Sequence, residues 1–165
     1  MPRRHRSRRS IYRPLKTAKY SNETFAFAIS RAFQEGQPSY VIVTAAAATL
    51  GTRKAKNFTL NFASSSSVPF FYCLVFVPEG TAPGPITAGS TVVDQTVNAA
   101  AFYNPNQNVI MSGVCLGGAA GIIRAKTRLA RNLNSGDKLV LIFQPTITYE
   151  GNIQFLGTIN YAISY

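Results

Sequence analysis

The 165-residue chain has no tryptophan, one histidine, two cysteines and only six acidic residues. The histidine, His5, lies among arginines near the N-terminus, so we expect no Ser-His-Asp or Cys-His catalytic constellation in the rest of the chain. The six acids are scattered singly and show no metal-ligand spacing with histidine or cysteine. The sequence therefore predicts a protein that is not an enzyme and that uses no metal or other cofactor.

Long apolar runs are also missing. No run approaches the roughly 18 residues of a transmembrane helix, and the basic start continues into IYRPLK instead of the apolar segment of a secretory signal. We expect no membrane insertion and a protein kept on the cytoplasmic or nuclear side. Cys73 and Cys115 each lie inside an apolar segment, which favours two buried free thiols, with a disulfide between them as the alternative.

Charged residues make up only 14% of the chain, too few for the solvated faces of several amphipathic helices. From Ser21 onward, short apolar segments rich in β-branched and aromatic residues are separated by Gly, Pro, Ser and Asn clusters. There is no βαβ alternation and no internal repeat. This pattern predicts an all-β domain over residues 21–165, a single jelly-roll β-sandwich of about eight antiparallel strands.

The individual strands follow from alternation and from turn signals. Residues 69–77, PFFYCLVFV, are apolar at every position, which predicts a central strand buried on both faces. Pro145 indicates an edge strand or a bulge, and residues 78–90, with three prolines and three glycines, predict an exposed loop, most exposed at 78–85. The other expected strands are 25–29, 39–45, 58–62, 91–97, 108–116, part of 121–131, 138–149 and 153–165.

Positive charge is present in excess, with a net charge of +11. Eight of the seventeen basic residues and none of the acids fall in the first twenty positions, whereas the remainder has nine bases against six acids. Residues 1–20 therefore predict a disordered, arginine-rich arm that binds a polyanion by counterion release, and a merely solubilising tail is the plain alternative. The expected nucleic-acid-binding residues of the arm are Arg3, Arg4, Arg6, Arg8, Arg9, Arg13, Lys16 and Lys19.

Two further features belong to this interpretation of the arm. Arginine makes bidentate phosphate contacts that lysine cannot, and Tyr12 and Tyr20 are placed to stack on unpaired bases. The run RRHRSRR at 3–9 also fits a nuclear-import receptor.

A second basic cluster comprises Arg124, Lys126, Arg128 and Arg131. If 121–129 is a strand, period two places the first three on one face, and if it is a helix, Arg124, Arg128 and Arg131 share a face. A third cluster, Arg53, Lys54 and Lys56, precedes the strand expected at 58–62. Each cluster alone fits an ordinary solvated surface as well as it fits a surface that meets nucleic acid.

The arm, the run of short strands and the segment RLARNLNSGDKLVLIF at 128–143 together resemble the coat proteins of circular single-stranded DNA viruses that encode their own replication initiator, the circovirus-like and nanovirus-like group. The resemblance implies a jelly roll that forms the smallest icosahedral shell of about sixty copies, in the virion and the host nucleus. It also implies that the arm and the cluster at 124–131 face the genome. Satellite-virus coats, which package RNA, share this plan.

We therefore expect a coat subunit whose partners are other copies of itself and single-stranded nucleic acid. Two alternatives stay open. One is a monomeric nucleic-acid-binding β-barrel module, and the other is a jelly-roll lectin or cytokine-like trimer, which needs a secretory route.

Overall fold

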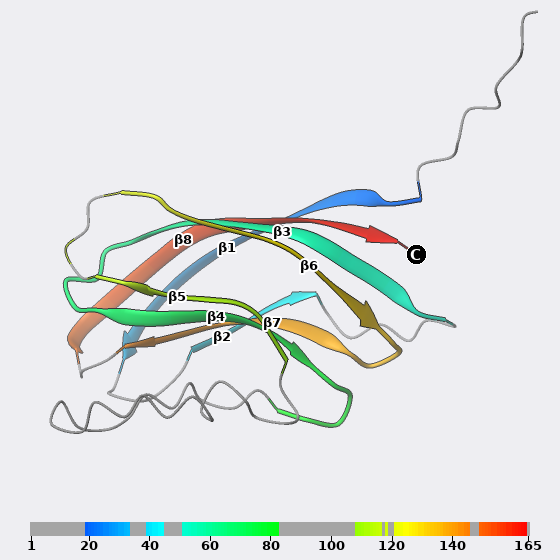
Figure 1. The fold of residues 1–165 in the computed structure, drawn as a ribbon. Helices are drawn as coiled ribbons and strands as arrows, with labels where there is room; N and C mark the ends of the chain where they lie inside the picture. The colour runs from blue at the N-terminus through cyan, green and yellow to red at the C-terminus, as the bar shows by residue number, and fades with distance from the viewer. Residues whose placement is uncertain are drawn as a thin grey trace, which may run out of the picture.

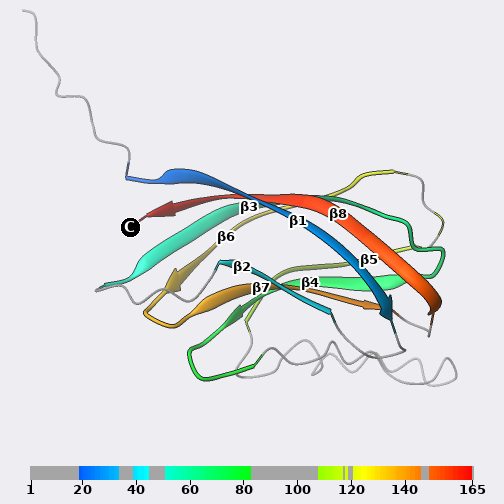
Figure 2. The same cartoon turned by 180° about the vertical axis from the view of Figure 1, so that it is seen from behind.

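A computed structural model describes residues 19–33, 39–44, 51–82, 108–116, 118, 121–145 and 149–164. These residues form eight strands and two antiparallel sheets (Figures 1 and 2). The strands are β1 (Ser21–Phe33), β2 (Ser39–Thr44), β3 (Arg53–Ser64), β4 (Phe70–Val77), β5 (Asn108–Cys115), β6 (Ile123–Leu133), β7 (Lys138–Pro145) and β8 (Tyr149–Ser164).

The strand order identifies the fold. Sheet A has the order β1-β8-β3-β6, and sheet B has the order β2-β7-β4-β5. The chain therefore crosses between the sheets at nearly every connection, and the two sheets stack as layers (Figure 1). Two four-stranded antiparallel sheets connected in this way are a jelly roll, which confirms the predicted fold class.

The core lies between the sheets and is rich in phenylalanine. Phe143 of β7 stacks on Phe155 of β8 with ring centroids 4.3 Å apart, and Phe70 of β4 meets the edge of Phe155 at 4.9 Å. Phe62 of β3 packs edge-on against Phe143 at 5.3 Å. Because these rings come from both sheets, their contacts hold the two layers together.

A second apolar cluster lies on the face of sheet B that points away from the core. Alternate residues of β4 and β7 build it, and all of them are at most 1% exposed: Cys73, Val75, Val77, Val140 and Ile142. The prediction that residues 69–77 form a central strand buried on both faces is confirmed, since β4 lies between β7 and β5. Both thiols are buried and free, as expected.

Two expectations need correction. β3 begins at Arg53, so the basic cluster at 53–56 lies within the strand and does not precede it. The interpretation of Pro145 was wrong, because β7 lies centrally between β2 and β4. Pro145 is tolerated as the last residue of β7: it pairs with Phe70 on one side, and the pairing with β2 already ends at Phe143.

The last strand confirms its predicted inward face, with Ile153, Phe155, Ile159, Tyr161 and Ile163 all buried. The strand expected at 91–97, the loop from 83 onward and Tyr165 lie outside the described residues. Of the expected loop, Glu79 and Gly80 are described and exposed.

Candidate nucleic-acid interface

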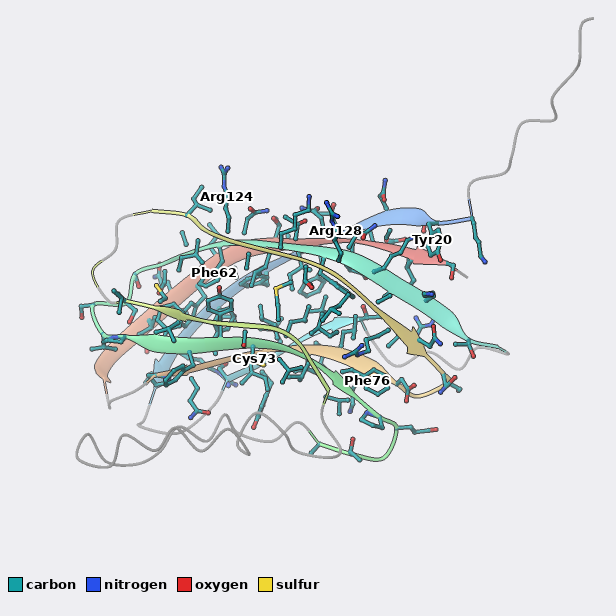
Figure 3. All side chains as sticks on the ribbon, viewed as in Figure 1. Tyr20, Phe62, Cys73, Phe76, Arg124 and Arg128 are labelled. Atoms are coloured by element: carbon teal, nitrogen blue, oxygen red, sulfur yellow. The ribbon has the colours of Figure 1, made fainter. Side chains whose placement is uncertain are left out.

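The outward face of sheet A has a row of three cations on β6. Arg124, Lys126 and Arg128 are exposed, whereas the alternate residues Ile123 and Ala125 pack against the core. The three cations therefore share one face, as the sequence predicts if residues 121–129 form a strand. Figure 3 shows Arg124 and Arg128 on the side of sheet A that faces away from sheet B, with Phe62 between the sheets. The row is therefore fully available to a partner.

Two more cations join the row from β3. Lys56 pairs with Ala130 of β6, and Lys54 pairs with Asn132, so both lysines lie beside the end of the arginine row. Lys54 is exposed and Lys56 is half-buried. We call these five residues the basic face: Lys54, Lys56, Arg124, Lys126 and Arg128.

A β-bulge at Asn57 turns the two lysines outward. Lys56 pairs with Ala162 and Thr59 with Asn160, so β3 uses one residue more than β8 over this stretch. Asn57 has a φ of 57°, the left-handed conformation that Asn tolerates better than most residues. Before the bulge the inward residues are at odd positions, and after it they are at even positions such as Phe58. Without the extra residue, period two would turn Lys54 and Lys56 toward the core.

Two of the described acids, Asp137 and Glu23, are directed away from the basic face. Asp137 is buried in the turn between β6 and β7, where its carboxylate accepts hydrogen bonds from the backbone N–H groups of Glu79 and Asn134. Glu23 lies in the inward row of β1, which also contains Phe25 and Phe27, and accepts a hydrogen bond from the Ser21 hydroxyl. Neither of these two carboxylates therefore lies among the cations of the basic face.

The last residue of the expected arm, Tyr20, lies against this face. The Lys56 Nζ is 3.6 Å from the centroid of the Tyr20 ring, a cation–π contact immediately before β1 begins at Ser21. Lys19 is exposed beside it. The chain therefore enters the sandwich at the basic face. The other seven expected arm residues lie outside the described part of the chain: Arg3, Arg4, Arg6, Arg8, Arg9, Arg13 and Lys16.

Arg131 does not share the basic face. It pairs with the fully buried Ala55, so it belongs to the inward row of β6, and its Nη1 donates to the Ala130 carbonyl at 3.1 Å. Arg53, 7% exposed, also lies inward. Within the described part of the chain, the Nε atoms of both arginines and the Nη2 of Arg53 are buried without a hydrogen-bond partner. These two guanidinium groups are therefore turned away from the surface on which the other cations lie.

Other kinds of site are not apparent in the described residues. They contain no group of three or more His, Cys, Asp or Glu side chains arranged to hold a metal ion. Burial raises the pKa of the Cys73 thiol to about 12, which keeps it protonated and unreactive at neutral pH. No described segment forms a helix with the length and apolar character needed to cross a membrane.

The chain is similar to solved structures of known proteins. The chain is similar to a solved chain of Desmodium yellow mottle tymovirus, with 11% sequence identity, 95% of each chain covered and a TM-score of 0.29. No protein-family model and no curated protein matches the chain. The assignment of the jelly roll depends on the strand order and register, not on this likeness.

Proposed function

We propose that the chain is the coat subunit of a small non-enveloped virus, a structural and non-enzymatic protein. In this proposal, copies assemble into a shell and the outward face of sheet A lines its interior. One observation supports this most directly: five cations on one face of a jelly roll adjoin the point from which the arginine-rich arm extends. A surface of cations and neutral polar groups binds phosphates with little dependence on sequence, as genome packaging requires.

Exposed apolar side chains support assembly. Leu116 and Ile122, which follow β5 and precede β6, are 71% and 62% exposed, and Val114 of β5 is also exposed. Apolar side chains that gather at one end of a molecule commonly mark contacts between proteins. In the proposed shell they are buried between neighbouring subunits.

The finer features of the proposal come from the resemblance to circovirus-like and nanovirus-like coats. They are a T=1 shell, single-stranded circular DNA as cargo, and an arm that also serves as a nuclear-import signal. About sixty arms with eight cations each supply about 480 positive charges toward neutralising the genome. Packaging of RNA, as in satellite viruses, is the alternative cargo, and nuclease digestion of the nucleic acid extracted from particles distinguishes the two.

The central test is deletion of residues 1–20. Purified full-length protein is expected to give particles of uniform diameter in negative stain, with an absorbance ratio at 260 and 280 nm that indicates bound nucleic acid. The truncated protein is expected to fold, because β1 begins at Ser21, and to lose most of that nucleic acid. Normal nucleic-acid content in truncated particles would refute the assigned role of the arm.

The competing function is a monomeric nucleic-acid-binding module, since a basic face serves a lone subunit equally well. Size-exclusion chromatography over a range of ionic strengths separates the two. Particles or defined oligomers support the coat subunit, and a monomer that binds nucleic acid at every ionic strength contradicts it.

A further inference from the structure

We propose that a hollow on the outward face of sheet A holds one unpaired base of the packaged strand. This inference depends on the proposed function, because it identifies part of the surface that meets the nucleic acid. The hollow has a volume of about 150 Å³, far above the roughly 10–15 Å³ that a single water needs. Side chains from three strands line it: Asn22 and Thr24 of β1, Asn57 of β3, and Asn160 and Ala162 of β8.

The polar groups of the hollow suit the edge of a base. A side-chain amide presents a donor and an acceptor in one plane, as the hydrogen-bonding edges of the bases require. Asn22 and Asn57 are exposed, so their amides are accessible to a ligand. The Thr24 hydroxyl donates to Oδ1 of Asn160 at 2.6 Å, which fixes the orientation of that amide. Three amides thus surround the hollow.

The charge distribution favours a base over a phosphate. Glu23 and Tyr161 also border the hollow, but their side chains belong to inward rows: Glu23 accepts from Ser21, and the Tyr161 hydroxyl accepts from Thr44. The outward side chains that line the hollow are therefore neutral. Cations lie at its border, since Lys56 pairs with Ala162, and Lys126 lies in the row of Thr59 and Asn160. A neutral base in the hollow leaves its flanking phosphates beside these lysines.

The backbone conformation at Asn57 supports the same assignment. Asn57 is the one described non-glycine residue with positive φ, and this conformation directs its side chain to the hollow. Residues held in sparsely populated conformations cluster at binding sites, where the surrounding structure maintains them. The bulge therefore supplies both an amide for the hollow and the outward turn of Lys56.

The test compares base-dependent and charge-dependent binding in the full chain. The probes are two single-stranded DNA oligonucleotides of equal length, one with bases and one fully abasic, measured by fluorescence anisotropy over a series of salt concentrations. The variant Asn22→Ala/Asn160→Ala removes two amides, and Lys56→Gln/Lys126→Gln removes two border cations. Thermal unfolding of each variant confirms that it folds.

We expect the wild-type protein to prefer the base-containing oligonucleotide by about tenfold, the order of one bidentate hydrogen-bonded contact with a base edge. The amide variant should show a smaller preference and keep the salt dependence, whereas the lysine variant should keep the preference with a shallower salt dependence. If the amide variant keeps the full preference, the hollow is not a base site. If the lysine variant keeps the full salt dependence, the proposed genome-facing surface itself is wrong.

Discussion

The two outward faces of the sandwich differ sharply, although each belongs to a four-stranded antiparallel sheet. On sheet A the central strand β3 turns Lys54, Lys56 and Thr59 outward, and on sheet B the central strand β4 turns Cys73, Val75 and Val77 outward. An antiparallel sheet commonly buries one face and solvates the other, as sheet A does. On sheet B the central part of the outward face is apolar and buried as well. Two sheets with the same number of strands thus present chemically different outward faces, so the fold alone does not set the polarity of a face.

The largest expected effect comes from removing the charge that distinguishes sheet A. Replacing all five residues of the basic face by glutamine should make the dependence of log K on log salt shallower by about 3 to 4, because each neutralised phosphate of a single strand contributes about 0.7. Salt-dependent anisotropy with a single-stranded oligonucleotide measures this slope.

The effect on binding of where the charges lie can be separated from the effect of net charge. The double variant Arg31→Gln/Lys138→Gln removes two cations that lie off the basic face and has the same net charge as Lys56→Gln/Lys126→Gln. We expect the first pair to keep the wild-type slope and the second to make it shallower. Equal slopes in the two variants would mean that net charge, and not the face, controls binding.

The second largest effect is the pH dependence of the unfolding free energy that the buried Cys73 thiol causes, and it tests the apolar character of the outward face of sheet B. Burial raises the pKa of this thiol from 9.0 to about 12, so the thiolate is less stable in the folded protein than in the unfolded one. The resulting stabilisation is complete below pH 9 and is lost as the pH rises toward 12. Over this window the free energy of unfolding should fall by up to about 1.4 kcal/mol per pH unit from this group.

The matched variant for this test is Cys73→Ala. Chemical denaturation at several alkaline pH values should show a shallower decrease of the unfolding free energy in the variant than in the wild type, because other groups titrate equally in both. Identical pH dependences would show that Cys73 is accessible to water in the folded protein, and the contrast between the two sheets would then be weaker than described.

Much of the fold could be predicted because it depends on local pattern. The alternation of Arg124, Lys126 and Arg128 with core residues is visible within six positions, and the uninterrupted apolar run of β4 indicates a two-faced strand. The basic face as a whole could not be predicted. The even positions Phe58, Leu60 and Phe62 face the core, so period two alone assigns Lys54 and Lys56 to the same inward row. Their outward turn requires the bulge at Asn57, which no periodicity reveals.

Smaller changes of unfolding free energy are expected when valine and threonine, which have nearly the same shape, replace each other at one position in each of the two central strands β3 and β4. Val75→Thr inserts a hydroxyl into the fully buried cluster on sheet B and should cost about 1–3 kcal/mol of unfolding free energy. Thr59→Val makes the reverse change at a half-buried outward position of sheet A and should stay within about 0.5 kcal/mol. Urea denaturation of both variants checks the pair. Equal costs would contradict the difference in burial between the two faces.

The smallest expected effect concerns the residue that creates the basic face. Glycine adopts the left-handed conformation freely, so Asn57→Gly should change the unfolding free energy by less than about 0.5 kcal/mol. Alanine adopts this conformation unfavourably, so Asn57→Ala should cost about 1 kcal/mol. Denaturation curves separate the two variants. Both remove the amide, so both should lose the preference for bases by the same factor despite their different stabilities. If Asn57→Ala is as stable as Asn57→Gly, the positive φ is not required at this position, and the outward turn of Lys54 and Lys56 needs another cause.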